Sequence, residues 1–242
     1  VSGSPEAAFD HEHAAWTLLL KGPVHAGGLV DYAGLSERRS DVNAYLASLR
    51  GVSAAAFASW FPAQREAYWI NAYNAWTISL ILDNPKVKSI RDLGGWFSSV
   101  FDQRFIPLQH LDARDSELSL GELEHQILGK SARTPLFHFA IVCASRSCPE
   151  LRAEAYRADQ LDAQLADQAR RFLADAAKND LSIQSDALRI SKIFDWSEQE
   201  LERYPGGIRA ILRDFGPEEL AKDPGLSRVR LKYRDYDWNL NA

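Results

Sequence analysis

A long apolar segment bounded by prolines constrains the fold of this chain more than any other feature. Pro62 precedes the segment 63–83 and Asn84-Pro85 follows it. Asn84 should end a helix, because the residue before a proline is biased away from the helical conformation. Between Tyr68 and Trp76 the segment is apolar on nearly every face of a helix. A helix of this kind is normally buried. We therefore expect a buried helix over residues 63–83.

The remaining pattern predicts a mixture of helices and short strands. A capping box formed by Ser119 and Glu122 marks the start of a helix that ends near Leu128. Apolar spacing predicts further helices over 6–20, 36–50 (with Ser36 as N-cap) and 158–178. Strands are predicted over Leu136–Cys143, over 181–190 as a hairpin that turns at Ser185-Asp186, and over 229–238.

This mixture indicates an α+β fold in which a helical part packs on a small, mostly antiparallel sheet. The chain has 242 residues, a length that one large domain can reach. No internal repeat, low-complexity run or clean linker divides the sequence. We therefore expect a single domain over residues 1–242.

Charge and hydropathy argue against two classes of partner. Lys and Arg number 28 and Asp and Glu number 33, so the net charge is 28 − 33 = −5. A mildly acidic chain lacks the basic surface that nucleic-acid binding usually needs. No segment approaches the roughly 18 consecutive apolar residues of a membrane span. We expect no nucleic-acid partner and no membrane span.

Two asparagines interrupt the predicted buried helix. Asn71 and Asn74 are three residues apart and therefore share a face. A buried amide without partners costs about 1–3 kcal/mol, so each side chain needs hydrogen bonds. Two interpretations stay open: both amides hold neighbouring backbone in place, or they line a cleft and contribute to a substrate site.

The helix after Ser119 places a carboxylate on its apolar side. At the spacing of an α-helix, Glu124 falls inside the apolar arc and His125 lies at its edge. An unpaired buried carboxylate is costly, so Glu124 needs a partner or a raised pKa. Two roles for Glu124 stay open: a structural ion pair with an arginine, or a catalytic role.

The loop Ala144–Pro149 is the most suggestive stretch for chemistry. Cys148 follows Arg146 and Ser147, and a neighbouring arginine favours the reactive thiolate. A histidine base and an orienting carboxylate or amide would complete a nucleophilic site. The candidate bases are His125 and His138, and the candidate orienting groups are Glu124 and Asn71. The candidate substrate-binding residues are Asn71, Asn74, Arg146 and Ser147.

Other interpretations of the two cysteines compete with this one. A disulfide between Cys143 and Cys148 would silence a nucleophile, and inert buried thiols are equally compatible with the sequence. A metal site with His125 and His138 is a third alternative, but Cys-x4-Cys spacing is a weak zinc signal. We expect no metal and no cofactor.

Several motifs in order resemble a known family. They are Gly28–Tyr32, Tyr68–Ala75, Ser119–Leu128, His138–Leu151, Leu188–Trp196 and Tyr236–Asn241. With these motifs the chain resembles domain of unknown function 547 (DUF547) over nearly its whole length. The resemblance implies a secreted or periplasmic protein and suggests a relationship to cysteine peptidase-like folds of the papain or transglutaminase kind.

Two hypotheses about function follow. The first is a thiol-dependent hydrolase, similar to a cysteine peptidase or amidase, that acts on a peptide or another small molecule. In it Cys148 attacks, His125 accepts the proton and Glu124 holds the imidazole, with His138 as the other candidate base. The alternative is a non-catalytic extracytoplasmic domain with a Cys143–Cys148 disulfide, in which some of the seven Trp, eight Tyr and eleven Phe residues line a groove for peptide or glycan.

Overall fold

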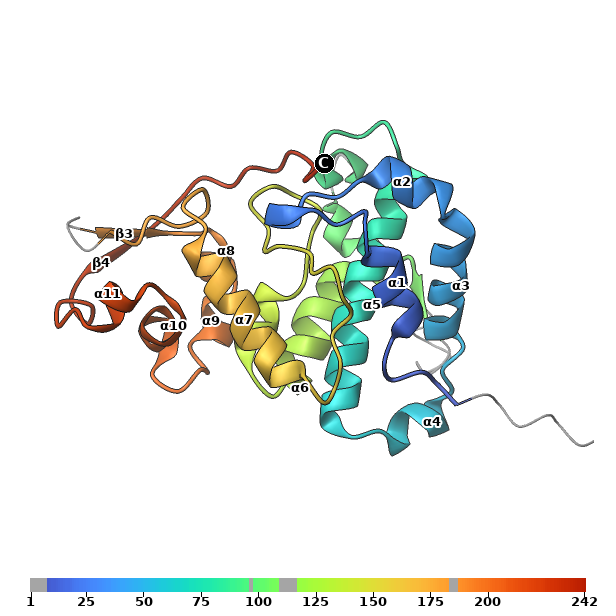
Figure 1. Cartoon of the computed structure of the whole chain (residues 1–242), viewed down its shortest axis with the longest axis horizontal. Helices are drawn as coiled ribbons and strands as arrows, with labels where there is room; N and C mark the ends of the chain where they lie inside the picture. Colours follow the sequence, from blue (N-terminus) through green and yellow to red (C-terminus); the bar gives the residue numbers. More distant parts are fainter. Residues whose placement is uncertain (1–7, 96–97, 109–116, 183–186) are drawn as a thin grey trace, which may run out of the picture.

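The computed structural model describes residues 8–95, 98–108, 117–182 and 187–242, and it has the predicted α+β fold. Helices make up most of it (Figure 1). The α-helices are α1 (Ala14–Leu20), α2 (Tyr32–Glu37), α3 (Arg39–Arg50), α4 (Ala54–Ser59), α5 (Pro62–Asp83), α6 (Gly129–Ser131), α7 (Leu161–Ala174), α8 (Ile193–Trp196), α9 (Glu198–Leu201), α10 (Gly207–Phe215) and α11 (Glu218–Ala221). The strands are β1 (Ile106–Pro107), β2 (Glu117–Leu118), β3 (Ala187–Ile190) and β4 (Arg230–Tyr233). Short 3-10 helices are η1 (Ala26–Gly28), η2 (Ile90–Leu93), η3 (Val100–Asp102) and η5 (Pro135–Phe139), and η4 (Glu122–Leu128) is a π-helix.

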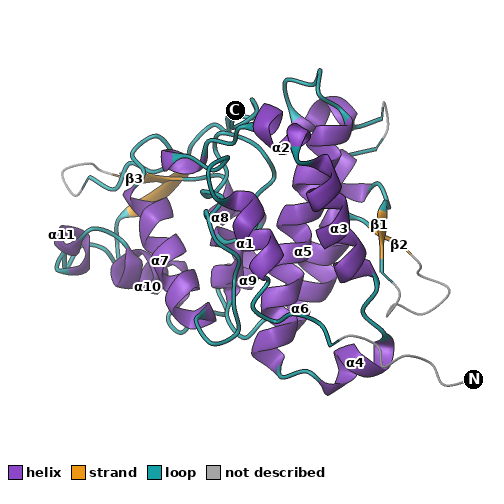
Figure 2. Cartoon of the chain, turned by 45° about the vertical axis from the view of Figure 1, so that its right-hand side comes forward, coloured by secondary structure: helices purple, strands orange, loops and turns teal. Residues whose placement is uncertain are grey.

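The central element is α5, which confirms the prediction from the apolar segment. Pro62 occupies its first turn, and Gln64 accepts a hydrogen bond from the backbone N–H of Phe61 at 2.9 Å. Every residue from Glu66 to Ala75 is buried. The N-terminal helices α1, α2 and α3 lie around α5 (Figure 2), and α2, α3 and η4 contact it directly.

The boundary predicted for the second helix is wrong. Ser36 lies inside α2, which is capped instead by Asp31, whose carboxylate accepts a hydrogen bond from Gly34 N–H at 2.9 Å. A kink at Arg38 then separates α2 from α3, and α3 ends at Arg50 as predicted, with Gly51 as its C-cap. A continuous apolar pattern cannot reveal such a kink.

The strand predicted over Leu136–Cys143 is also wrong. Pro135 and the hydroxyl of Thr134, which accepts a hydrogen bond from Leu136 N–H, start the 3-10 helix η5 there, and irregular backbone follows it. Every residue from Pro135 to Val142 is buried. A short run that is apolar on all sides lacks periodicity, so a buried helical turn and a buried strand have the same sequence pattern.

The sheet structure is small and divided. β1 pairs antiparallel with β2, whereas β3 pairs parallel with β4 over four residues. β4 confirms a strand in the predicted tail segment, but it is shorter than expected. The predicted turn at Ser185-Asp186 lies outside the described residues.

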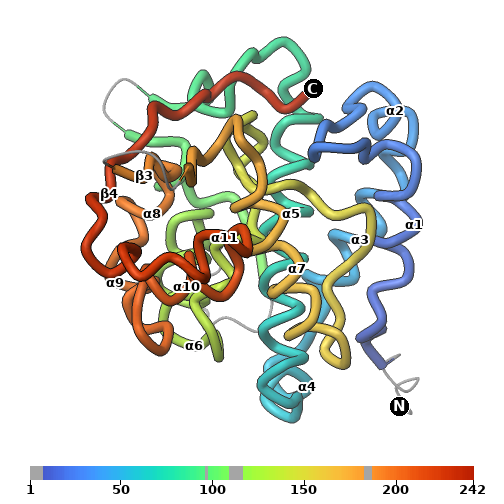
Figure 3. The backbone as a smooth tube through the Cα atoms, turned by 60° about the vertical axis from the view of Figure 1, so that its left-hand side comes forward, coloured from blue at the N-terminus to red at the C-terminus, as the bar shows by residue number. Residues whose placement is uncertain are grey.

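The C-terminal segment after β4 runs back across the molecule to the N-terminal helices (Figure 3). Ser145 and Leu240 form an antiparallel bridge, and Asn241 N–H donates to the carbonyl of Ala144 at 3.1 Å. Tyr32 Oη donates to Asn241 Oδ1 at 2.7 Å. The tail therefore packs along the loop that contains both cysteines.

Candidate functional site

The π-helix η4 positions two titratable side chains. Its start is the predicted capping box: Ser119 N–H donates to Glu122 Oε2 at 2.8 Å, and Glu122 N–H donates to Ser119 Oγ at 3.1 Å. A π-helix has more residues per turn than an α-helix, so consecutive side chains diverge by less than 100°. This geometry lets the neighbours Glu124 and His125 line the same pocket. Short π-helical segments are frequent at functional sites.

Glu124 is paired with a histidine. Its Oε1 lies 3.4 Å from Nδ1 of His138, and its Oε2 accepts a hydrogen bond from Tyr73 Oη at 3.3 Å. Burial raises the pKa of Glu124, but His138, with smaller contributions from His125 and Tyr73, outweighs burial and holds that pKa below its usual value. The sequence predicted a partner for this carboxylate. The partner is a buried imidazole, and its other nitrogen, Nε2, has no hydrogen-bond partner among the described residues.

His125 has a different carboxylate partner. Its Nδ1 lies 3.2 Å from Oε1 of Glu200 on α9. The His125 side chain is 42% exposed, whereas that of His138 is 1% exposed. The expected contact between His125 and Glu124 is therefore replaced by two separate imidazole–carboxylate pairs, whose rings lie 6.4 Å apart.

Cys143 and Cys148 form a disulfide. The loop between them contains Ala144 at a positive φ of 60°, a conformation that L residues rarely adopt. Three donors surround Sγ of Cys148: the backbone N–H of Cys143 at 3.0 Å, and the hydroxyls of Ser145 and Tyr236 at 3.2 Å each. Burial raises the pKa of Tyr236, so its hydroxyl keeps its proton at neutral pH.

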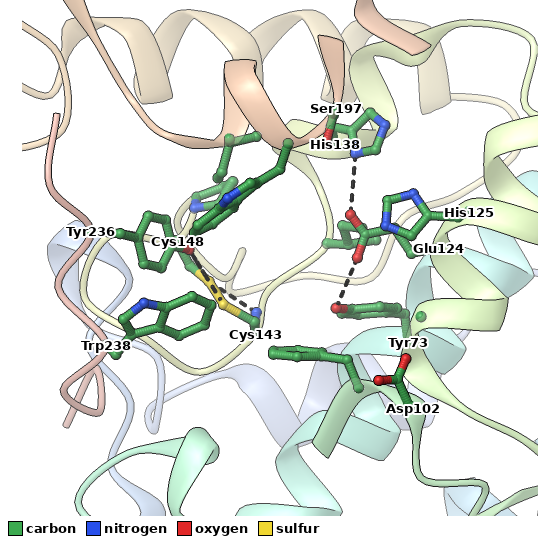
Figure 4. A pocket seen from close by; sticks show the side chains of 16 residues that line it. Tyr73, Asp102, Glu124, His125, His138, Cys143, Cys148, Ser197, Tyr236 and Trp238 are labelled. Atoms are coloured by element: carbon green, nitrogen blue, oxygen red, sulfur yellow. Dashed lines mark hydrogen bonds and ion pairs between the residues drawn. A yellow bond between two sulfur atoms is a disulfide. The ribbon is translucent and has the colours of Figure 1, made fainter. Parts of the chain in front are cut away.

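The disulfide and the two histidines line one pocket of about 270 Å3 (Figure 4). Glu124, His125 and His138 lie on one side of it, and the disulfide, Tyr236 and Trp238 lie on the other. Among the described residues, neither sulfur is hydrogen-bonded to an imidazole. The predicted nucleophile and the predicted bases therefore share a cavity without touching.

Three aromatic rings form one wall of the pocket. The Tyr236 ring centroid lies 4.6 Å from that of Trp238 and 4.8 Å from that of Trp196, and the two indoles are 5.5 Å apart. Trp196 is 46% exposed. We call these three residues the aromatic wall. An indole with half its surface in water at a cavity mouth is available to stack on a ligand.

The side chains of Asn71 and Asn74 form hydrogen bonds with backbone groups and do not line this pocket. Asn71 accepts from Tyr156 N–H at 2.9 Å and donates to Tyr156 O at 2.8 Å. Asn74 accepts from Val142 N–H at 2.8 Å and donates to Ala140 O at 2.9 Å. The bonds of Asn74 fix the segment that leads to the cysteine loop, and those of Asn71 fix the backbone of Tyr156 beyond that loop.

Arg146 and Ser147 hold the C-terminal tail. Arg146 donates from Nε to Leu240 O at 3.3 Å, and Ser147 Oγ accepts from Asp237 N–H at 2.8 Å. Neither residue lines the pocket of the histidines. Both contacts instead help to seat Tyr236 and Trp238 in the aromatic wall.

Sequence reasoning missed several residues of the pocket. Tyr73, Asp102, Trp196, Tyr236 and Trp238 line it, and Glu200 supports His125. Trp196 ends one of the motifs that carried the family resemblance, and Tyr236 and Trp238 belong to another, so these motifs were the available signal. Nothing in the sequence marked Asp102 or Glu200.

The described residues contain neither a metal-binding cluster nor a membrane-spanning helix. No group of three or more His, Cys, Asp or Glu side chains in the described part of the chain is arranged to hold a metal ion. None of the helices within those residues is both long enough and apolar enough to cross a bilayer.

The protein is an α+β domain with a small pocket that imidazoles, carboxylates and a disulfide line. Residues 57–173 match the model of the family described as "Protein of unknown function, DUF547". No curated protein and no solved structure matches the chain. The match includes α5, η4, both cysteines and both histidines, but the aromatic wall lies beyond it.

Proposed function

We propose that this chain is an extracytoplasmic ligand-binding domain that holds part of a peptide or glycan in the pocket. The observation that supports this proposal most directly is the aromatic wall, whose rings border a preformed cavity beside acceptor groups. Ligand sites typically combine apolar and aromatic walls with a few placed polar groups.

The disulfide supports the extracytoplasmic part of the proposal. Disulfides persist in secreted and periplasmic proteins and are rare in the reducing cytosol. Here the two cysteines of the chain are joined to each other across a short loop. In this role the disulfide holds the loop against Tyr236 and keeps one face of the pocket rigid.

Binding can be tested by following the indole N–H signals of Trp196 and Trp238 by NMR. Pools of blocked tripeptides and chitotriose serve as probes, and we expect one of the two classes to shift both signals. The variant Trp196→Ala should abolish or strongly weaken binding. Phe61→Ala, at an aromatic residue that is 75% exposed and does not line the pocket, is the matched control. If neither class of probe moves these signals, the binding proposal is wrong.

A second candidate function is a thiol-dependent hydrolase that acts when the disulfide is reduced. The observation that favours it is the set of three donors around Cys148 Sγ, since donors of this kind stabilise a thiolate. In this mechanism the Cys148 thiolate attacks a substrate carbonyl, His125 passes the thiol proton to the leaving amine, and water then hydrolyses the thioester. Glu200 rather than Glu124 would hold His125, and His138 with Glu124 would lie beside it.

This candidate requires the pocket to narrow, because the imidazoles and sulfurs lie on opposite sides (Figure 4). A pair of single variants tests it. Cys143→Ser leaves the Cys148 thiol free without reductant, so it should hydrolyse a peptide pool constitutively, whereas Cys148→Ser should be inactive. Alkylation of Cys148 in Cys143→Ser should show an apparent pKa below the roughly 8.5 of a free thiol. An inactive Cys143→Ser protein with an ordinary thiol pKa would refute the hydrolase hypothesis.

A further inference from the structure

The polar groups of the pocket are mainly hydrogen-bond acceptors. Asp102 and Glu124 contribute carboxylates, and the low pKa of Glu124 keeps it ionised at neutral pH. Nδ1 of His138 faces the Glu124 carboxylate, and in the tautomer that donates from Nδ1 the other ring nitrogen, Nε2, is an acceptor. That Nε2 is buried and has no hydrogen-bond partner within the part of the chain that the structure describes. A ligand that complements these groups must bring donors.

The formal charge of the pocket is negative. Among the described residues that line it there is no lysine or arginine, whereas there are two carboxylates. Asp102 is exposed, and its carboxylate has no hydrogen-bond or ion-pair partner within the described part of the chain. An uncompensated carboxylate at a cavity mouth attracts cations and repels anions.

The opposite wall also favours a cation. Aromatic faces attract ammonium and guanidinium groups within about 6 Å of the ring centroid. One ring of the wall already binds such a group, because the guanidinium carbon of Arg91, which does not line the pocket, lies 5.2 Å from the Trp238 centroid. A cation in the cavity would therefore meet carboxylates on one side and the aromatic wall on the other (Figure 4).

We propose that the pocket selects the cationic side chain of a lysine or arginine in a peptide ligand. This inference rests on the proposed binding function and specifies its ligand. An ammonium or guanidinium group has only donors, which matches the acceptors of Asp102, Glu124 and His138. A neutral glycan would stack on the aromatic wall but would leave the charge of Asp102 uncompensated.

Four probes compare side-chain charge on one peptide scaffold, with lysine and norleucine as the pair of similar shape. They are the blocked tripeptides acetyl-Gly-X-Gly-amide with X as lysine, arginine, norleucine or glutamate, titrated against the unreduced wild-type protein. We expect the lysine and arginine peptides to bind about tenfold more tightly than the norleucine peptide, and the glutamate peptide to bind most weakly. The binding of the basic peptides should weaken as salt is raised. The same titration with n-butylammonium shows whether a free ammonium ion binds as tightly as the lysine side chain of a peptide.

One acidic position tests the electrostatic part. Asp102→Asn should weaken binding of the lysine peptide by up to about fivefold and leave the norleucine peptide unchanged. Glu37→Gln removes the same charge from an exposed residue at the end of α2, away from the pocket, and is the matched control. Trp196→Phe should retain most of the binding because it keeps an aromatic face, whereas Trp196→Leu should lose it. Both positions are at least partly exposed, so the variants should fold, and circular dichroism verifies this.

The possible outcomes separate this inference from the proposed function. If basic and norleucine peptides bind equally, or chitotriose binds more tightly than any peptide, the pocket binds ligands but the cation inference is wrong. If n-butylammonium binds as tightly as the lysine peptide, the peptide part of the inference is wrong. If no probe binds, the proposed function fails as well.

Discussion

Acidification should destabilise this protein through one buried histidine near its N-terminus. His13 is 1% exposed and its Nδ1 lies 2.7 Å from Tyr45 Oη, whereas its buried Nε2 has no hydrogen-bond partner in the described ranges of the chain. Burial lowers the pKa of His13 from 6.5 to about 4; nearby Asp10 opposes the shift and His11 adds to it. The folded state therefore favours the neutral imidazole.

The size of the effect follows from the two pKa values. Because the folded pKa lies below the unfolded one, the stabilisation is fully present above pH 6.5 and is lost as the pH falls towards 4. Between pH 7.5 and pH 4.5 the contribution of His13 to the free energy of unfolding should fall by about 2.5 kcal/mol. Other groups titrate in this range, so a difference between two variants is needed to isolate it.

Urea unfolding of the wild type and of His13→Asn at both pH values makes that comparison. Asparagine tolerates the left-handed backbone of this position, where φ is 48°, and it does not titrate. We expect the wild type to lose about 2.5 kcal/mol more than His13→Asn on acidification. His25→Asn, at an exposed histidine, should behave like the wild type. Parallel pH profiles for the wild type and His13→Asn would refute the reasoning.

Two further predictions concern stability and are checked by urea or thermal unfolding. Arg133→Met should lower the free energy of unfolding by about 2–3 kcal/mol, because it leaves the Glu66 carboxylate buried without its cation. The Glu66 side chain is 2% exposed and accepts from Arg133 Nε at 2.9 Å. Adding Glu66→Gln to Arg133→Met should restore much of the lost stability. A double variant no more stable than Arg133→Met would contradict this. Gly27→Ala should cost about 1 kcal/mol, since its φ is 76° but its surroundings are open. Gly28→Ala should cost clearly more, because its Cβ would lie 2.7 Å from Glu150 Cα, and equal losses at the two glycines would show that this contact relaxes.

The sequence predicted those elements whose signal is local. α5 was found because its apolar pattern and its flanking prolines lie within one segment, and the capping box of η4 was found because Ser119 and Glu122 are three residues apart. The segment Leu136–Cys143 was assigned wrongly because burial on all sides removes the periodicity that separates strand from helix. Local signals also gave no hint that η4 is a π-helix.

The site was predictable as a set of residue types but not as a set of contacts. The burial expected for Glu124 correctly demanded a partner, yet which group it meets depends on how η5 packs against η4. His125 instead meets Glu200, which is 75 positions away. The aromatic wall joins Trp196 to residues 40 or more positions further along the chain, so only the folded tail creates it.

The position of the tail has a consequence for the order of folding. Asn241 bonds to Tyr32 and to Gly28 O, contacts that join residues 209 and 213 positions apart, and contacts so distant in sequence carry a high loop-closure entropy and form slowly. The disulfide closes a loop of only five positions and can form long before them. The cysteine loop can therefore close before the tail covers it, and Tyr236 and Trp238 complete the cavity only when the last segment docks. We therefore expect the side of the pocket that holds Glu124 and His138 to form before the side that holds Tyr236 and Trp238.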